Sequence, residues 1–205
     1  MACRNQDAPG RDLARPALSC YHLAMPTLSF KAILVPLLAA GLLAACSPHY
    51  NWRDYSSQDA PFRVMFPDKP STHTRAIDLD GLTVNMTMTA VQVDGTMYAV
   101  GSAEAPDAAK AQAALGAMKT ALVRNIGATI TRESSAVASA ASGAAVVQRA
   151  VIDIEASGSQ NGQPMKLIGH FESRNKRFYQ VIVMGRDKAV LPEQTEQFMS
   201  SFKLL

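Results

Sequence analysis

An uncharged apolar segment near the start of the chain limits which residues can build a folded domain. Residues 32–45 read AILVPLLAAGLLAA, and Cys46 follows them directly. A helix rises about 1.5 Å per residue, so the segment covers roughly 21 Å of a hydrocarbon core that is about 30 Å thick. Pro36 and Gly41 weaken helix formation further, and the single charge of Lys31 precedes the segment. This pattern is typical of the apolar region of a secretory signal, which leaves the later residues to fold.

The end of the apolar segment carries a more specific pattern. Leu43, Ala44, Ala45 and Cys46 spell LAAC, which resembles the lipobox of the type II signal peptide of bacterial lipoproteins. The resemblance implies that the Cys46 thiol receives a diacylglyceryl group, that cleavage occurs just before it, and that the new amino terminus is acylated. Ser47 stands where an Asp would favour retention in the inner membrane, so the resemblance implies the outer membrane of a Gram-negative bacterium. A buried helix or an ordinary signal peptide that happens to contain a Cys is the alternative.

The lipobox divides the chain into segments. Counting back from it, Met25 gives a leader of the usual length, so we expect 1–24 to be a mis-called or disordered extension, although Met1 stays open as the start. Residues 25–45 are then the signal peptide, 46–60 a tether and 61–205 an α+β domain. Three aromatic residues alternate in the tether and either begin the first strand or lie at the membrane interface: Tyr50, Trp52 and Tyr55.

Composition narrows the possible partners. The chain has 205 residues, of which 48% are hydrophobic and 18% charged, which excludes a disordered chain. Two of the three cysteines lie in the leader, so the mature chain has no pair for a disulfide. After residue 45 there are sixteen Lys and Arg and fifteen Asp and Glu, without the basic excess of nucleic-acid-binding proteins. Nucleic acid is therefore not an expected partner. The expected partners are the membrane, through the lipidated Cys46, and proteins of the cell envelope.

The residues after the tether alternate between apolar and polar, which is typical of strands. Phe62, Val64 and Phe66 share one face of a strand, and two Asp-Gly pairs at 80–81 and 94–95 suit tight hairpin turns. The pattern predicts strands over 62–66, 72–79, 82–93, 96–103 and, further along, near 128–133, 144–155, 164–174 and 177–185. We expect loops over 134–143 and 157–162, because Ser, Ala and Gly are abundant there.

Two helices complete the expected fold. Pro106 suits the first turn of an Ala-rich helix and Gly127 its end. Its apolar stripe comprises Ala111, Leu115, Met118, Leu122 and Ile126. A short helix runs from Pro192 towards Ser200. The expected class is α+β: an antiparallel sheet of a meander and hairpins, with the Ala-rich helix packed on one face and a short C-terminal helix.

Three segments of the domain resemble PsbP-like domains. They are FRVMFP at Phe62–Pro67, RFYQVIVMG at Arg177–Gly185 and FMSSFKL at Phe198–Leu204. The resemblance implies an antiparallel sheet flanked by helices. It implies no function, because these segments are packing patterns without a chemical motif.

Hairpin pairing predicts one set of soft ligands. With Asp80–Gly81 as a two-residue turn, His73 lies opposite Met88, and Met86 shares their face. An imidazole and two thioethers suit Cu(I), which makes these residues a weak candidate metal site. The alternative, which we favour, is that both methionines belong to the core.

A second set lies on the last hairpin. With Asn175 and Lys176 as its turn, His170 faces Val181 and Glu172 faces Tyr179, so His170 and Glu172 are candidates for acid and base work in a hydrolase. No nucleophile accompanies them, and the chain lacks GxSxG, HExxH, CxxC and phosphate-binding glycine motifs. We therefore expect a non-enzymatic accessory or binding module without a cofactor, and a small-ligand or metal carrier as the alternative.

Overall fold

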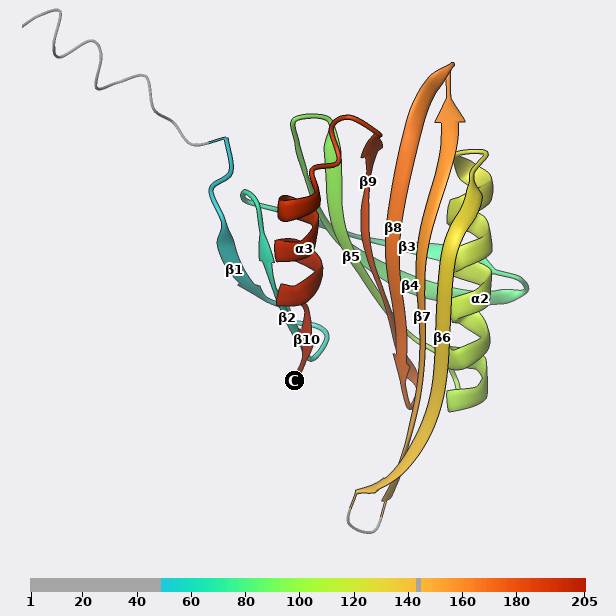
Figure 1. The fold of residues 1–205 in the computed structure, drawn as a ribbon. Coiled ribbons are helices and arrows are strands. Elements are labelled where there is room, and N and C mark those ends of the chain that lie inside the picture. The colour runs from blue at the N-terminus through green and yellow to red at the C-terminus, as the bar shows by residue number, and fades with distance from the viewer. Residues whose placement is uncertain (1–48, 143–144) are drawn as a thin grey trace, which may run out of the picture. The chain divides into compact units, whose positions relative to one another are not determined.

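The computed structural model describes residues 49–142 and 145–205, which form ten strands and two helices (Figure 1). The strands are β1 (Arg53–Ser56), β2 (Phe62–Phe66), β3 (Ser71–Leu79), β4 (Leu82–Val93), β5 (Thr96–Glu104), β6 (Thr129–Ser142), β7 (Ala145–Gln160), β8 (Gln163–Arg174), β9 (Arg177–Arg186) and β10 (Lys203–Leu204). The helices are α2 (Ala108–Asn125) and α3 (Pro192–Ser201). In this part of the chain, seven strands form one sheet in the order β3-β4-β5-β9-β8-β7-β6, and β1, β2 and β10 form another. The expected α+β class is thus confirmed for the described residues.

Tight turns set the register of the large sheet. Asp80 and Gly81 have φ angles of 57° and 86°, and Asp94 and Gly95 have φ angles of 50° and 80°. Positive φ at both central residues twists the chain in the sense that the flanking antiparallel strands require. The predicted meander of β3, β4 and β5 is therefore confirmed, and β3 pairs with β4 in the predicted register.

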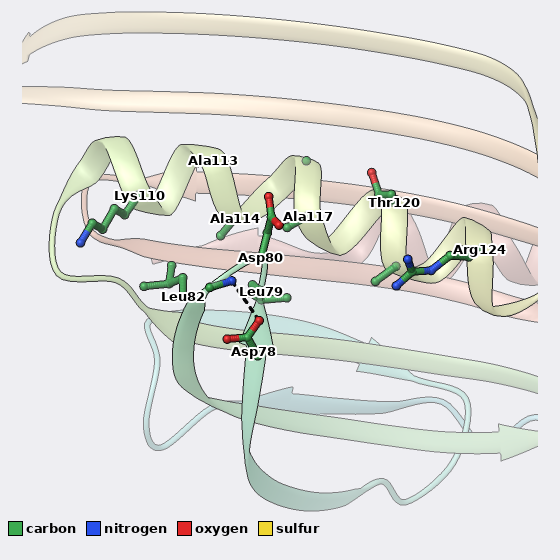
Figure 2. A pocket seen from close by; sticks show the side chains of 13 residues that line it. Asp78, Leu79, Asp80, Leu82, Lys110, Ala113, Ala114, Ala117, Thr120 and Arg124 are labelled. Atoms are coloured by element: carbon green, nitrogen blue, oxygen red, sulfur yellow. Dashed lines mark hydrogen bonds between the residues drawn. The ribbon is translucent and has the colours of Figure 1, made fainter.

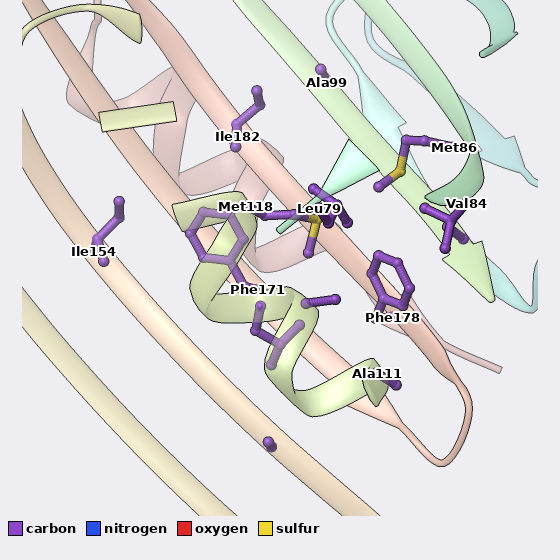
Figure 3. Close-up of a cluster of buried hydrophobic side chains, with 14 of the residues drawn as sticks. Leu79, Val84, Met86, Ala99, Ala111, Met118, Ile154, Phe171, Phe178 and Ile182 are labelled. Carbon is purple, nitrogen blue, oxygen red and sulfur yellow. The ribbon is translucent and has the colours of Figure 1, made fainter. Parts of the chain in front are cut away.

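One hydrophobic core, here called the first core, contains side chains from α2 and from the large sheet. The helix contributes Ala111, Leu115 and Met118, and the sheet contributes Phe171 and Phe178, all at most 2% exposed. Figure 3 shows apolar side chains from the strands gathered beside the helix. Asp107 caps the helix by accepting a hydrogen bond from the backbone N–H of Lys110 at 2.8 Å.

A second core lies on the opposite face of the large sheet and is rich in aromatic rings. Along β9, Phe178 and Ile182 belong to the first core, whereas Tyr179 and Val181 belong to the second. Ring pairs join the small sheet, α3 and the large sheet to one another, with centroid distances of 5.4–6.1 Å: Phe66–Phe198, Tyr98–Phe198 and Phe62–Tyr179. Alternation along the central strands thus supplies both cores, as expected of a sheet covered on its two faces.

The expected tether contains ordered structure. Arg53–Ser56 pair with β2 as strand β1, and Tyr50, Trp52 and Tyr55 pack against the second core. The backbone N–H of Asn51 also donates to the carbonyl oxygen of Pro67 at 2.8 Å. Of the two alternatives for these aromatic residues, the structure thus bears out the one in which they begin the first strand and cover the domain edge. The later residues of 46–60 belong to the domain because the rings bury apolar area against it.

Two expected loops are wrong. Strand β6 covers most of 134–143, because ladder hydrogen bonds use the backbone and an exposed edge strand needs little side-chain packing. Strand β7 covers most of 157–162, and the turn is confined to Asn161 and Gly162. Gly158 lies inside β7, where the backbone of Ile126 and Ala128, just after α2, leaves no room for a Cβ atom. The small residues of β6 thus belong to an edge strand, and Gly158 in β7 marks a close backbone contact. Composition alone does not distinguish either case from a loop.

The C-terminal helix is confirmed. It begins at Pro192 and ends at Ser201, and β10 then pairs with β2, so the chain closes the small sheet. Among the helices that the structure describes, none is long and apolar enough to cross a membrane.

Gly158 provides a test of the contact between β7 and the end of α2. An added Cβ would lie 2.6 Å from the carbonyl oxygen of Ile126 and 2.8 Å from Cα of Ala128, both backbone atoms. We expect Gly158→Ala to lower the free energy of unfolding by roughly 1–3 kcal/mol, because the backbone must shift. Urea denaturation followed by circular dichroism measures this.

Gly116→Ala is the matched control. Its added Cβ meets no atom within 4 Å, and Gly116 lies inside α2. We expect it to raise the free energy of unfolding by about 0.5–1 kcal/mol, since Ala favours helix. Equal stabilities for the two variants would contradict the close approach at Gly158.

Candidate functional site

A groove with charged side chains lies on the second-core face of the large sheet, beside the C-terminal segment. Its volume is about 600 Å³. Strands β7 and β8 contribute Arg149, Asp153, His170, Glu172 and Arg174, and the end of α3 with β10 contributes Met199, Ser200, Phe202, Lys203 and Leu204. We call it the His170 groove. The ring of His170 lies 6.0 Å from the ring of Phe202, which links the polar strands to the C-terminal segment.

Four side chains from β7 and β8 form one ion-pair network in this groove. Arg149 Nε donates to Glu172 Oε1 at 2.5 Å. His170 Nδ1 lies 2.6 Å from Asp153 Oδ1, and His170 Nε2 lies 3.3 Å from Glu172 Oε2. The Glu172 side chain is 8% exposed, whereas Asp153 is 52% exposed. The buried carboxylate is therefore held by two cations, and the imidazole bridges two carboxylates.

The network favours charged forms of its members. Burial raises the pKa of Glu172, but hydrogen bonds from His170 and Arg149 outweigh burial and lower that pKa from 4.5 to about 2. Burial lowers the pKa of His170, and its hydrogen bonds to Glu172 and Asp153 outweigh burial, so the pKa is raised above 6.5. Burial also raises the pKa of Tyr179, the residue opposite Glu172. Both shifts agree with a charged His170 that lies between two ionised carboxylates.

This arrangement limits what His170 can do chemically. With a carboxylate at each ring nitrogen, the charged imidazole donates both of its N–H groups. A general base needs a free lone pair directed at the proton that it removes. The nearby hydroxyl of Ser200 donates to the carbonyl oxygen of Gln197 at 3.4 Å. The geometry therefore suits binding of a polar ligand better than nucleophilic catalysis.

Sequence reasoning found half of the network. The predicted pairs of His170 with Val181 and of Glu172 with Tyr179 are present. However, Tyr179 is 1% exposed, because its side chain belongs to the second core. Arg149 and Asp153 were missed because the long loop expected over 157–162 hid the direct pairing of β7 with β8. A two-residue turn at Asn161 and Gly162 would have placed Asp153 opposite His170 in the predicted hairpin. The opposite charges of neighbouring strands were therefore the signal in the sequence.

The soft ligands of the first hairpin pair as predicted but lie in different surroundings. His73 is opposite Met88, and Arg75 is opposite Met86. Met86 is 2% exposed in the first core, whereas His73 is exposed. The sulfur of Met88 accepts a hydrogen bond from Gln180 Nε2 at 3.2 Å. Within the described residues, no three His, Cys, Asp or Glu side chains are grouped to hold a metal ion.

A larger concave surface lies between the β3–β4 turn and α2, with a volume of about 830 Å³ (Figure 2). Small side chains such as Ala113 and Ala117 line the helix side, and Lys110 and Arg124 lie towards its two ends. Asp78 Oδ1 accepts a hydrogen bond from the backbone N–H of Gly81 at 2.9 Å, so this carboxylate supports the turn. The surface is wide, and its polar groups do not converge on one point.

The lipobox residues Leu43, Ala44, Ala45 and Cys46 lie outside the described residues, as do the expected extension over 1–24 and the signal peptide. Neither the comparison with protein-family models nor the comparison with curated proteins finds a match for this chain. The assignment of a function therefore depends on the residues themselves.

The network gives stability a defined pH dependence. A lowered pKa means that the contribution of Glu172 is complete above 4.5 and is lost as the pH falls towards 2. A raised pKa means that the contribution of His170 is complete below 6.5 and is lost as the pH rises through the raised value. We expect Glu172→Gln to lower the free energy of unfolding at pH 6 by roughly 2 kcal/mol, with a smaller loss near pH 2.

Glu104→Gln is the control, because Glu104 is 55% exposed and pairs with Arg177 at 2.9 Å. We expect it to cost less than about 1 kcal/mol at either pH. Urea denaturation of both variants over a pH series makes the comparison. A pH-independent loss in Glu172→Gln would contradict the ion-pair network.

Proposed function

We propose that this chain is a lipid-anchored lipoprotein of the bacterial cell envelope, whose domain faces the periplasm from the outer membrane as a non-enzymatic accessory or binding module. The observation that carries the proposal is LAAC at Leu43–Cys46, directly after an uncharged segment of signal-peptide length. Acyl chains on one Cys anchor stably, because each buried methylene contributes about 0.8 kcal/mol.

The first described residues support a domain held close to the membrane. Tyr50 and Trp52 pack against the second core, and the backbone of Asn51 is bonded to Pro67. Tyr50 is the fourth residue after Cys46, and an extended chain covers at most about 3.6 Å per residue. A lipidated Cys46 would therefore hold Tyr50 within about 14 Å of the headgroups. This distance is shorter than the root-mean-square span of a fifteen-residue flexible tether, which is about 20 Å.

The His170 groove supports a binding role. It combines a polar floor from Arg149 and His170 with apolar side chains from the C-terminal segment such as Phe202, a mixture typical of small-ligand sites. A small-ligand carrier that uses this groove is accordingly the second candidate function. We further infer that the Ala-rich helix α2 is a structural layer on one face of the sheet, and that the similarity to PsbP-like domains lies in this architecture and carries no activity with it.

The anchor can be tested in a Gram-negative host. We expect the wild-type chain to incorporate a clickable palmitate analogue and to sediment with outer membranes, and Cys46→Ala to lose the label completely, since the acceptor thiol is gone. In-gel fluorescence after labelling, together with membrane fractionation, measures both effects.

Cys20→Ala is the matched control, because Cys20 lies before Met25 in the expected extension. It should label as the wild-type chain does. Undiminished labelling of Cys46→Ala would overturn the proposed lipid attachment. Mass spectrometry of the mature amino terminus would overturn the cleavage site if it found residues before Cys46.

A further inference from the structure

Three methionines lie on three successive strands of the large sheet, β5, β9 and β8, on its first-core face. Met97 in β5 is directly opposite Met184 in β9. Met165 in β8 is opposite Arg186, two residues from Met184 along β9. Directly opposed residues have Cβ atoms about 5 Å apart, and diagonal neighbours about 7 Å apart. Met184 on β9 lies between the other two, unbranched thioether side chains span gaps of this size, and all three line the same cavity.

These methionines pack against the first core but are more exposed than the methionines inside it. Met97, Met165 and Met184 are half-buried and line a cavity of about 670 Å³ near the turns that join β4 to β5 and β7 to β8. Met86 and Met118, by contrast, are each 2% exposed within the first core. The described residues that line this cavity include none from α2. The thioethers of the cavity are therefore accessible to an ion from solvent.

The remaining lining selects against most metal ions. Its other polar side chains are the neutral amides of Gln92, Gln160, Asn161 and Gln163, and its single charged side chain is Arg186. No carboxylate, imidazole or thiol stands among the described residues that line the cavity. Hard ions such as Mg²⁺ and Ca²⁺ need oxygen ligands with negative charge, and Zn²⁺ prefers imidazole or thiolate. Thioethers are soft ligands that suit monovalent copper.

We propose that Met97, Met165 and Met184 form a binding site for a soft monovalent metal ion, Cu(I) in the cell envelope. The three neutral sulfurs supply the ligands, and the cavity gives the ion a path from solvent. The site shares no residue with His73, Met86 and Met88, and it does not depend on the lipid anchor. Because thioethers carry no proton to lose, the affinity is independent of pH between about 5 and 8.

Competition for Cu(I) tests the site. The full-length chain, with its three cysteines replaced by serine to remove thiolates, is titrated in detergent under anaerobic conditions against a chromogenic Cu(I) chelator. We expect one ion to bind per chain. Met97→Leu and Met184→Leu should each weaken binding by about tenfold or more, whereas Met65→Leu, in β2, should leave it unchanged. Equal affinity in Met97→Leu and in the parent chain would overturn the proposal.

A spectroscopic measurement identifies the ligands without substituting any methionine. In the same chain labelled with ¹³C-methyl methionine, Ag(I) serves as a probe that does not change oxidation state. We expect the methyl signals of Met97, Met165 and Met184 to shift together with saturation at one equivalent, and those of Met86 and Met88 to stay. Shifts confined to Met86 and Met88 would assign the ion to the first hairpin and overturn the proposal.

Arg186 allows a further test, because Cu(I) binding would not respond to this residue if the three methionines served only in packing. Its cation stands beside the proposed ion, so Arg186→Gln should strengthen Cu(I) binding by about two- to threefold at low salt. Weaker binding in Arg186→Gln, or binding that falls steeply between pH 7 and pH 5 as imidazole ligation would require, contradicts a site of three thioethers.

Discussion

Strands β5 and β9 pair along nine residues, from Thr96 with Gly185 to Glu104 with Arg177, although α2 and three strands separate them in the chain. This antiparallel ladder joins the early meander of β3, β4 and β5 to the late one of β6 to β9. Both strands are almost wholly buried, so their side chains alternate between the first core and the second. The helix α2, the small sheet and α3 all bury their apolar faces against the surface that this pairing creates.

The same ladder also sets the positions of the charged side chains in the His170 groove. Because β8 pairs with β9 and β7 with β8, His170 lies opposite Asp153 on the face that the small sheet covers only in part. There a buried carboxylate at Glu172 is tolerated because Arg149 and His170 supply charged hydrogen-bond donors. The stability of this face is thus tied to ionisation, whereas the opposite face carries neutral thioethers at Met97 and Met184.

Predictions from the sequence succeeded where local patterns were sufficient and failed where long-range contacts decided. The Asp-Gly turns, the stripe of α2 and the strand at Phe62–Phe66 follow from φ preferences and periodicity, and the pair of His73 with Met88 follows from a two-residue turn. The strand over 134–142 was missed because an edge strand of Ser and Ala has no apolar alternation. Arg149 and Asp153 were missed for a different reason: the loop expected over 157–162 hid the register of β7 against β8, which sets their place in the site.

The sequence by itself determined the apolar segment with LAAC, the nearly neutral later chain, the hairpin registers and the two helices, because each depends on neighbouring residues or on composition. Only the tertiary structure decided that the aromatic residues after His49 pack against the domain, that His170 bridges two carboxylates, and that Met165 joins Met97 and Met184. Each of these depends on side chains from strands far apart in the chain. Their meeting is set by backbone pairing across the sheet, which leaves no local pattern in the sequence.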